Sequence, residues 1–202
     1  MIEFLIGIDE VGRGPIAGPV AVCAFLIDSI FQEEVEKFSK ENKLPLRDSK
    51  KLTEKMRDRW YEFLVKSKKE GKCDFSVSLV SASDIDKHGI VPAIKKALAT
   101  SLKKVTSDTS VKIVLDGGLK APSEYTNQES FIKGDELYPV ISLASIVAKV
   151  SRDTLMKKYA KEFPEYGFEN NAGYGTKSHY EAIQKNGLTV LHRKSFLKKL
   201  VK

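Results

Sequence analysis

The 202-residue sequence has few of the side chains that build disulfide scaffolds or zinc sites, with two cysteines and three histidines. Cys23 and Cys73 form no metal-ligand spacing, and the pair is typical of two reduced thiols rather than of a disulfide. His88, His179 and His192 show no ligand spacing either, and we expect them at ordinary surface or capping positions. The sequence therefore favours neither a disulfide-rich secreted fold nor a zinc enzyme.

Long hydrophobic runs are absent as well. The longest one, around residues 20–27, is far too short to span a bilayer. Glu3 and Asp9 interrupt the hydrophobic stretch at the N-terminus and no basic segment precedes it, which argues against a signal peptide. Together with the reduced cysteines, these features predict a cytoplasmic protein with no membrane partner.

Positive charge is what the chain has in excess, with a net charge of +7 and a pI near 9.2. An excess of lysine and arginine attracts polyanions because their binding releases condensed counterions, so nucleic acid is a candidate partner. Charge alone leaves the question open, since many basic proteins bind no nucleic acid and composition indicates attraction rather than a site.

Hydrophobic periodicity predicts an alternation of strands and helices in a chain long enough to bury one full core. Continuous or alternating apolar residues predict strands at residues 3–9, 20–27, 75–79, 111–115 and 131–132. Helical spacing predicts helices at residues 52–69, 91–105 and 139–160, and a short helix from residue 176. Thr53 is placed to cap the first of these helices. We expect an α/β fold with a mixed central β-sheet flanked by helices and a C-terminal helical extension.

The segment GRGPIA at residues 12–17 formally matches the G-x-G-x-x-[GA] pattern of dinucleotide sites and follows a predicted strand. That pattern needs a helix beginning at the glycines, but two prolines and a glycine interrupt residues 15–19, and residues 20–27 are β-like. Asp9 and Glu10 would also place two negative charges beside a diphosphate. We therefore expect no dinucleotide site here.

Acidic residues at strand ends point to different chemistry. Asp9 closes the first predicted strand and is followed by Glu10, while Asp116 closes the strand VKIVLD, and open α/β sheets place their sites at such ends. Asp153 lies on the small, apolar and basic helical segment SLASIVAKVSRD. Each acid alone has an ordinary explanation at a turn or on a solvated face, so only their convergence would make a metal site.

If the four acids converge, their chemistry is constrained. Oxygen ligands without nearby histidine or cysteine favour a hard ion such as Mg²⁺ or Mn²⁺ over zinc. In a basic protein, such a site suits phosphodiester hydrolysis by two metal ions, one activating water and the other stabilising the leaving oxygen.

Five blocks of the sequence, taken together, resemble the ribonuclease HII family, the type 2 ribonucleases H. The blocks are DEVGRGPIAGPV, DSKKLT, VLDG, SLASIVAKVSRD and GYGTKSHYEAI, and they run in the family's order along nearly the whole chain. Val11 stands where the family commonly has alanine, and the match fades just after VLDG. The resemblance implies a ribonuclease H-like catalytic domain over residues 1–165, with a helical substrate-contacting segment over residues 166–202 packed on it.

The resemblance also implies roles for particular residues. The four family carboxylates that hold two Mg²⁺ or Mn²⁺ ions match Asp9, Glu10, Asp116 and Asp153. The expected substrate-binding residues are Gly12, Arg13, Gly14, Ser49, Lys50, Lys149, Arg152 and Tyr174.

Within this set, the Gly12–Gly14 segment matches the one that reads the 2′-hydroxyl of a ribonucleotide, where glycines allow the backbone to approach the sugar. Tyr174 matches the tyrosine that packs on the following deoxyribose, and Lys50 matches a phosphate contact. Bland alternatives stay open: Tyr174 as a packed surface aromatic, residues 49–50 as an ordinary loop, and Lys149 with Arg152 as charges that offset the acids.

The activity implied is an endonuclease that cuts on the 5′ side of ribonucleotides, in RNA–DNA hybrids and at single ribonucleotides in duplex DNA, leaving 3′-hydroxyl and 5′-phosphate ends. We expect a monomer. Two alternatives remain. The sister type, ribonuclease HIII, prefers runs of ribonucleotides and usually carries an extra N-terminal domain, whereas this sequence places its first strand at Glu3. A non-catalytic hybrid binder would gain nothing from acids facing phosphate.

Overall fold

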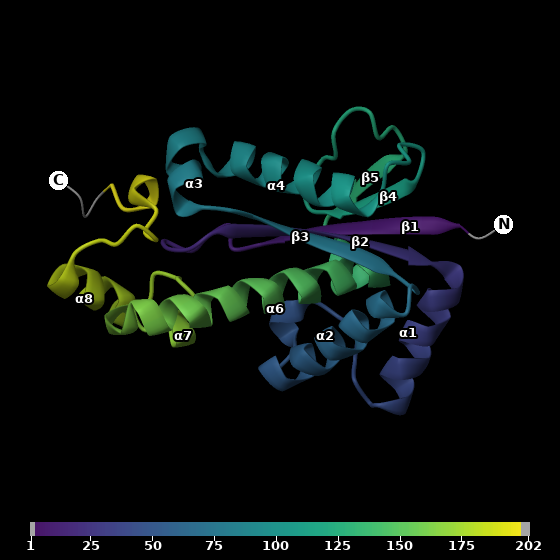
Figure 1. Cartoon of the computed structure of the whole chain (residues 1–202), viewed down its shortest axis with the longest axis horizontal. Coiled ribbons are helices and arrows are strands. Elements are labelled where there is room, and N and C mark those ends of the chain that lie inside the picture. The colour runs from purple at the N-terminus through teal and green to yellow at the C-terminus, as the bar shows by residue number, and fades with distance from the viewer. Residues whose placement is uncertain (1–2, 199–202) are drawn as a thin grey trace.

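A five-stranded sheet in the order β3-β2-β1-β4-β5 forms the centre of the computed structural model, which describes residues 3–198 (Figure 1). Strands β1, β2 and β3 pair antiparallel, while β1, β4 and β5 pair parallel, so the expected mixed sheet is confirmed. The strands are β1 (Phe4–Val11), β2 (Val20–Asp28), β3 (Asp74–Val80), β4 (Lys112–Asp116) and β5 (Gln128–Phe131).

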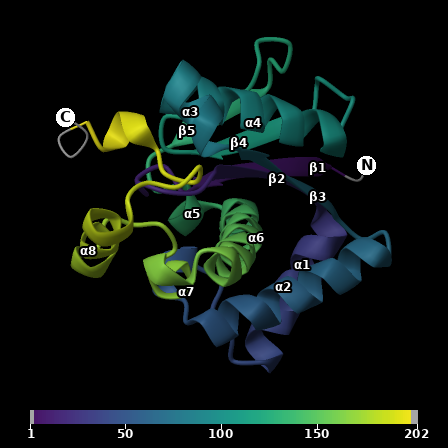
Figure 2. The ribbon, with the colours of Figure 1, turned by 60° about the vertical axis from the view of Figure 1, so that its left-hand side comes forward.

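Helices cover both faces of the sheet. Figures 1 and 2 show α3 and α4 over one face, and α6 with α1 and α2 over the other. Short helices α5, α7 and α8 flank the ends of α6. The helices are α1 (Ser29–Glu41), α2 (Glu54–Lys69), α3 (Ala82–His88), α4 (Ile90–Val105), α5 (Gly134–Leu137), α6 (Pro139–Glu162), α7 (Phe168–Asn171) and α8 (Lys177–Asn186).

The predicted helices are present, and their caps explain where two of them begin. Thr53 accepts a hydrogen bond from the backbone N–H of Met56 at the start of α2, and Thr176 accepts one from His179 at the start of α8. Helix α1 was not predicted, because only Phe31 and Val35 are fully buried on it and its remaining residues are largely polar. None of the helices in the described part of the chain is both long and apolar enough to cross a membrane.

Strand β1 is sandwiched between the two helical layers, and alternate residues serve different faces. Ile6 and Ile8 pack in the core under α4, whereas Gly7 faces α6. A Cβ on Gly7 would lie 2.5 Å from the carbonyl carbon and oxygen of Val140. Glycine is therefore what allows α6 to lie directly against the strand.

The chain after α6 folds back onto the loop between β1 and β2. Ile16 and Ala17 of that loop pack in one apolar cluster with residues of α6, α7 and α8. The expected division between residues 165 and 166 falls inside the 3-10 turn Pro164–Tyr166, and a two-part organisation stays a prediction.

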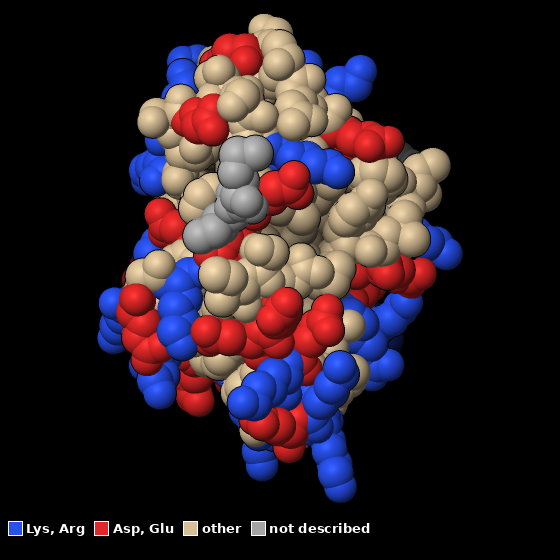
Figure 3. All heavy atoms as spheres, turned by 90° about the vertical axis from the view of Figure 1, so that its right-hand side faces the viewer, with Lys and Arg blue, Asp and Glu red and all other residues tan. Residues whose placement is uncertain are grey.

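Charge of both signs is spread over the end of the molecule formed by α1 and α2. Figure 3 shows lysine and arginine interspersed with aspartate and glutamate there. Lys72 pairs with Glu34 and with Glu70, at 2.8 and 3.3 Å between charged atoms. The excess positive charge thus forms no continuous patch on this face.

Substitution of Gly7 by alanine tests the contact between β1 and α6. The added methyl group meets backbone atoms that no side-chain rotation can move, and we expect a loss of about 2–3 kcal/mol in the free energy of unfolding. Urea denaturation followed by circular dichroism measures it. Gly118→Ala is the control, because a Cβ there meets nothing within 4 Å and its φ is not positive. Equal stability of the two variants would contradict the contact.

Candidate active site

The parallel pairing of β1 and β4 brings two of the predicted acids together. Ile8 lies opposite Leu115 in the sheet, and the residues that follow are Asp9 and Asp116. Strand alternation turns both carboxylates towards the face covered by α6. The backbone N–H of Gly134 donates to Oδ1 of Asp116 at 2.8 Å, which fixes that side chain.

Asp9 lies in an environment that opposes its negative charge. It is 7% exposed, and burial, with smaller contributions from the charges of Glu10 and Asp116, raises its pKa to about 8. A hydrogen bond from Ser145 on α6 acts in the opposite direction. Burial also raises the pKa of Glu10, although Arg13 partly offsets that rise. Three acids thus share one partly enclosed region with little compensating charge.

Asp153 lies farther along α6, outside the group of charges that act on Asp9 and Glu10. The further acid within electrostatic reach of Asp116 is Asp135, whose pKa is raised by burial and by the charges of Asp48 and Asp116. Residues 145, 149 and 153 follow one another at helical spacing, so Asp153 lies about 12 Å beyond Ser145 on the same face of the helix. The ammonium of Lys149 lies 2.9 Å from Oδ1 of Asp153 and forms an ion pair with it. Within residues 3–198, no three acidic, histidine or cysteine side chains stand in a ready metal-binding group. Asp9, Glu10 and Asp116 are within electrostatic reach of one another, while Asp153 is held by lysine.

Arg152 is fully buried, and its guanidinium is occupied by the protein itself. Its Nε donates to Pro19 O at 2.9 Å, Nη1 to Ala172 O at 2.9 Å, and Nη2 to Ala17 O at 3.2 Å. The expectation that Arg152 contacts substrate directly is therefore corrected: it joins α6 to the loop between β1 and β2. A charged residue beside an acid looks solvent-exposed in a sequence, and only tertiary structure shows its carbonyl partners.

Arg193 holds the same loop from the C-terminal side and was missed by sequence reasoning. It is also fully buried, and it donates from Nε to Gly18 O at 2.9 Å, from Nη1 to Arg13 O at 3.0 Å, and from Nη2 to Gly12 O at 2.7 Å. Its position in the basic run HRKSFLKK gave no signal of burial. Part of that basic tail, residues 199–202, lies outside the described residues.

The loop presents only part of the Gly12–Gly14 segment to solvent. Gly12 is buried with φ +91°, and a Cβ on it would lie 2.3 Å from Nε of Arg152, so packing and backbone conformation require the glycine. Packing thus gives a sufficient reason for the glycine, and the expected approach of this segment to a sugar stays a prediction. Arg13 and Gly14 are exposed, and a Cβ on Gly14 would meet nothing within 4 Å.

The other expected substrate residues also divide into buried and exposed ones. Ser49 is buried, with its hydroxyl 2.8 Å from that of Ser145, which corrects the expectation of a direct contact and places it behind Asp9. Lys50 is exposed at the 3-10 turn Ser49–Lys51. Lys149 is mostly buried and pairs with an acid, in agreement with the charge-offsetting alternative.

Tyr174 borders the loop and is 41% exposed. The carbonyl of the preceding residue, Gly173, accepts hydrogen bonds from the backbone N–H groups of Ile16 and Ala17 at 2.9 and 3.1 Å. The expected platform and the expected 2′-hydroxyl reader are therefore neighbours, although they are about 160 residues apart in the chain.

The histidine expectations were wrong for two of the three. His88 is exposed, but His179 and His192 are buried and hydrogen-bonded to each other. Their separation of 13 residues matches no sequence motif. They meet only because the chain turns back after α8.

Comparisons with known proteins agree with this arrangement. The family model described as Ribonuclease HII matches residues 6–199. Ribonuclease HII of Bacillus subtilis (strain 168) is 41% identical over 194 residues, covering 96% of this chain and 69% of the relative. Ribonuclease H2 from Pyrococcus horikoshii OT3 has a similar structure, with a TM-score of 0.74, 24% identity, and coverage of 97% and 96%. Bst-RNase HIII in complex with Mn²⁺ gives a TM-score of 0.68 at 16% identity, with coverage of 98% and 70%. These structures share the ribonuclease H-like fold.

The substitution Asp9→Asn tests the electrostatic strain at the strand end. The pKa of Asp9 is about 8 in the folded chain, above its ordinary value of 3.8, so ionisation opposes folding increasingly as the pH rises from 4 to 8. In EDTA at pH 8 we expect the variant to be more stable by about 1–2 kcal/mol, a shift of roughly 2–8 °C in the unfolding midpoint. Scanning calorimetry of both proteins at pH 4 and 8 measures it. If the difference in unfolding midpoint between variant and wild type is the same at both pH values, the raised pKa of Asp9 is contradicted.

Arg193→Lys tests the anchoring of the loop. One ammonium cannot replace three planar donors, so we expect a loss of about 2–4 kcal/mol in the free energy of unfolding. Arg59→Lys is the control, because Arg59 is exposed and, among residues 3–198, its guanidinium donates only to Asn42. Urea midpoints that fall equally in both variants would show that the three carbonyl contacts contribute nothing particular.

Proposed function

The chain belongs to the ribonuclease HII family and is a hydrolytic ribonuclease, and we propose that it cuts RNA in RNA–DNA hybrids and the 5′ side of single ribonucleotides in duplex DNA. The products would be 3′-hydroxyl and 5′-phosphate ends. The observation that carries the proposal is the meeting of Asp9, Glu10 and Asp116 beside the glycine loop. The likeness to ribonuclease HIII, at 16% identity, is one of fold alone.

The acids fit a pair of hard divalent cations. We propose that Asp9, Glu10, Asp116 and Asp153 hold two Mg²⁺ or Mn²⁺ ions. The charges of Glu10 and Asp116 add to the burial that raises the pKa of Asp9, and the charge of Asp116 likewise acts on Glu10. All donors are oxygen, which suits such ions. Lys149 now neutralises Asp153, and a cation would compete with that ion pair. When bound, the ions would activate water and stabilise the leaving oxygen.

The exposed edge of the loop suits recognition of a ribose. Neither the backbone N–H of Arg13 nor that of Gly14 donates a hydrogen bond within the described residues. With the carbonyls of Gly12 and Arg13 held by Arg193, these amides are the donors that remain for a 2′-hydroxyl. Arg13 also places a cation at this edge, 3.6 Å from Glu10.

Tyr174 would then pack on the sugar that follows the ribonucleotide. Its ring is partly exposed next to the loop, as a stacking platform requires. A second 2′-hydroxyl at that sugar would be disfavoured by the ring, which gives a preference for a ribonucleotide followed by a deoxyribonucleotide. Lys50, exposed near the acids, would contact a phosphate.

Asp153→Asn tests the catalytic part of the proposal. Replacing the carboxylate weakens metal binding without removing the substrate surface, so we expect turnover on an RNA–DNA hybrid to fall about 100-fold or more while hybrid affinity in Ca²⁺ changes little. Asp108→Asn, the same change in an exposed loop before β4, is the control. Turnover equal to wild type in Asp153→Asn would remove this residue from the site.

Tyr174→Ala tests substrate discrimination. Loss of the ring should lower the preference for a single ribonucleotide over a continuous hybrid about 10-fold, because stacking on an aromatic side chain contributes about 1–3 kcal/mol. Tyr174→Phe keeps the ring and should keep the preference. The readout is the ratio of kcat/KM values for the two substrates, and an unaltered ratio in the alanine variant would sink the assignment.

A further inference from the structure

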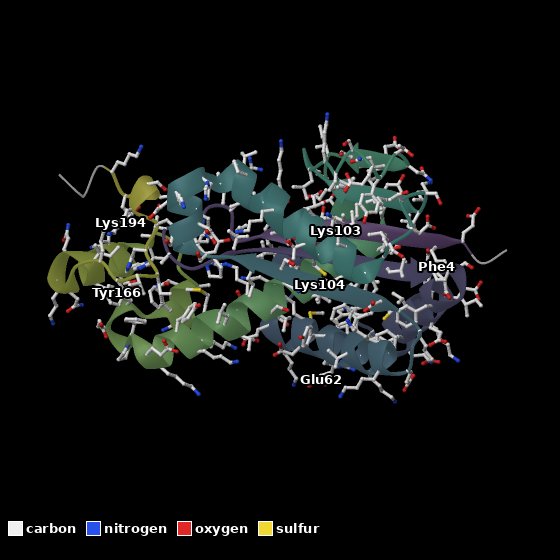
Figure 4. The ribbon with its side chains drawn as sticks, turned by 45° about the horizontal axis from the view of Figure 1, so that its top comes forward. Phe4, Glu62, Lys103, Lys104, Tyr166 and Lys194 are labelled. Atoms are coloured by element: carbon white, nitrogen blue, oxygen red, sulfur yellow. The ribbon has the colours of Figure 1, made fainter. Side chains whose placement is uncertain are left out.

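His179 and His192 form a buried pair that the proposed chemistry does not use. They are 0% and 2% exposed, and their Nε2 atoms lie 3.1 Å apart. The rings of Tyr166 and Phe168 pack around them, with centroids 5.0–6.4 Å away. Figure 4 labels Tyr166 at the end of the molecule opposite Phe4, on the side that also carries α8.

The hydrogen-bond partners allow one arrangement of protons in this pair. Nδ1 of His192 accepts from the backbone N–H of Thr189 at 2.9 Å, so the proton of this neutral ring is on Nε2. That N–H therefore donates to Nε2 of His179, whose own proton is then on Nδ1. Nδ1 of His179 donates to the carbonyl oxygen of Tyr174 at 2.8 Å. A directed chain thus runs from Thr189 to Tyr174.

This series of hydrogen bonds ends at Tyr174, which has a proposed role in substrate recognition. The Tyr174 carbonyl also accepts from the backbone N–H of Thr176 at 2.9 Å, and Gly173 is tied to the glycine loop. The backbone at Tyr174 is consequently held from the loop on one side and from the histidines on the other. Because the backbone directs the side chain, this support sets where the exposed ring stands.

We propose that His179 and His192 are positioning residues for Tyr174, which hold its ring in register with the glycine loop and thereby set the preference for a ribonucleotide–deoxyribonucleotide junction. This inference rests on the proposed function, in which that ring packs on the deoxyribose. Both histidines are buried, and within residues 3–198 neither is hydrogen-bonded to an acidic side chain.

The support requires both rings to be neutral. A second proton on His179 would set two Nε2–H groups against each other at 3.1 Å. A second proton on His192 would set its Nδ1–H against the backbone N–H of Thr189 at 2.9 Å. Burial lowers the pKa of both, that of His192 to about 4, and no acidic side chain in the described residues counteracts this. Of the neighbouring groups, the Tyr166 hydroxyl donates to Gly187 O, Phe168 is apolar, and the Arg193 guanidinium points to loop carbonyls.

Two substitutions of His179 distinguish positioning from simple packing. His179→Leu fills the space but offers no donor, whereas His179→Asn places an amide N–H where Nδ1 now donates. We expect the leucine variant to lose about fivefold or more of the single-ribonucleotide preference, with hybrid cleavage within about threefold of wild type, and the asparagine variant to retain the preference. A preference unchanged in His179→Leu, or lost equally in both variants, overturns the inference.

Nitrogen NMR of the wild-type protein gives a test that needs no variant to fold. The series of hydrogen bonds from Thr189 to Tyr174 predicts a proton on Nδ1 of His179 and on Nε2 of His192 at pH 6, with both rings neutral. The exposed ring of His88 serves as a reference. Opposite or averaged tautomers would overturn the inference. If Tyr174→Ala leaves the preference intact, the proposed function fails. If that variant loses it and His179→Leu does not, the positioning alone fails.

Discussion

Helix α6 lies against strand β1 at backbone distance, and this contact sets the position of every group in the candidate site. The helix meets the backbone of the strand at Gly7, near Val140, and the side chain of its Arg152 meets the loop after the strand at Gly12. Between these two points it presents Ser145 to Asp9, and just beyond them Asp153. A Cβ at Gly7 would separate the helix from the strand, and with them Ser145 from Asp9, while a Cβ at Gly12 would displace the side chain of Arg152.

Buried acids and buried arginines occupy different places in this domain. Carboxylates gather at the ends of β1 and β4, where burial, with smaller contributions from the neighbouring acids, raises the pKa of Asp9. The two buried guanidinium groups, of Arg152 and Arg193, are directed away from those acids and onto backbone carbonyls. Burial lowers the pKa of both arginines, and a hydrogen bond from each guanidinium nitrogen to a carbonyl reduces the free-energy cost of burying them. The result is a rigid loop next to an acidic region suited to cations.

Local signals in the sequence predicted much of the fold. Strand alternation, helical spacing and the cap at Thr53 located the main elements. The strand ends singled out Asp9 and Asp116, but whether these acids meet stayed open until the parallel pairing of β1 and β4 was known. The roles of buried polar groups could not be predicted this way. Arg152 looked like a substrate contact, because a sequence does not show that three carbonyls from distant segments surround it. The histidine pair likewise exists only through tertiary contact.

The most direct test of the account is product mapping on a DNA duplex that contains one ribonucleotide, with Mg²⁺, with Mn²⁺ and with EDTA. We expect one metal-dependent cut immediately 5′ of the ribonucleotide, with a 3′-hydroxyl and a 5′-phosphate, and no cut in EDTA. Cleavage confined to long RNA–DNA hybrids, or cleavage that persists in EDTA, would contradict it.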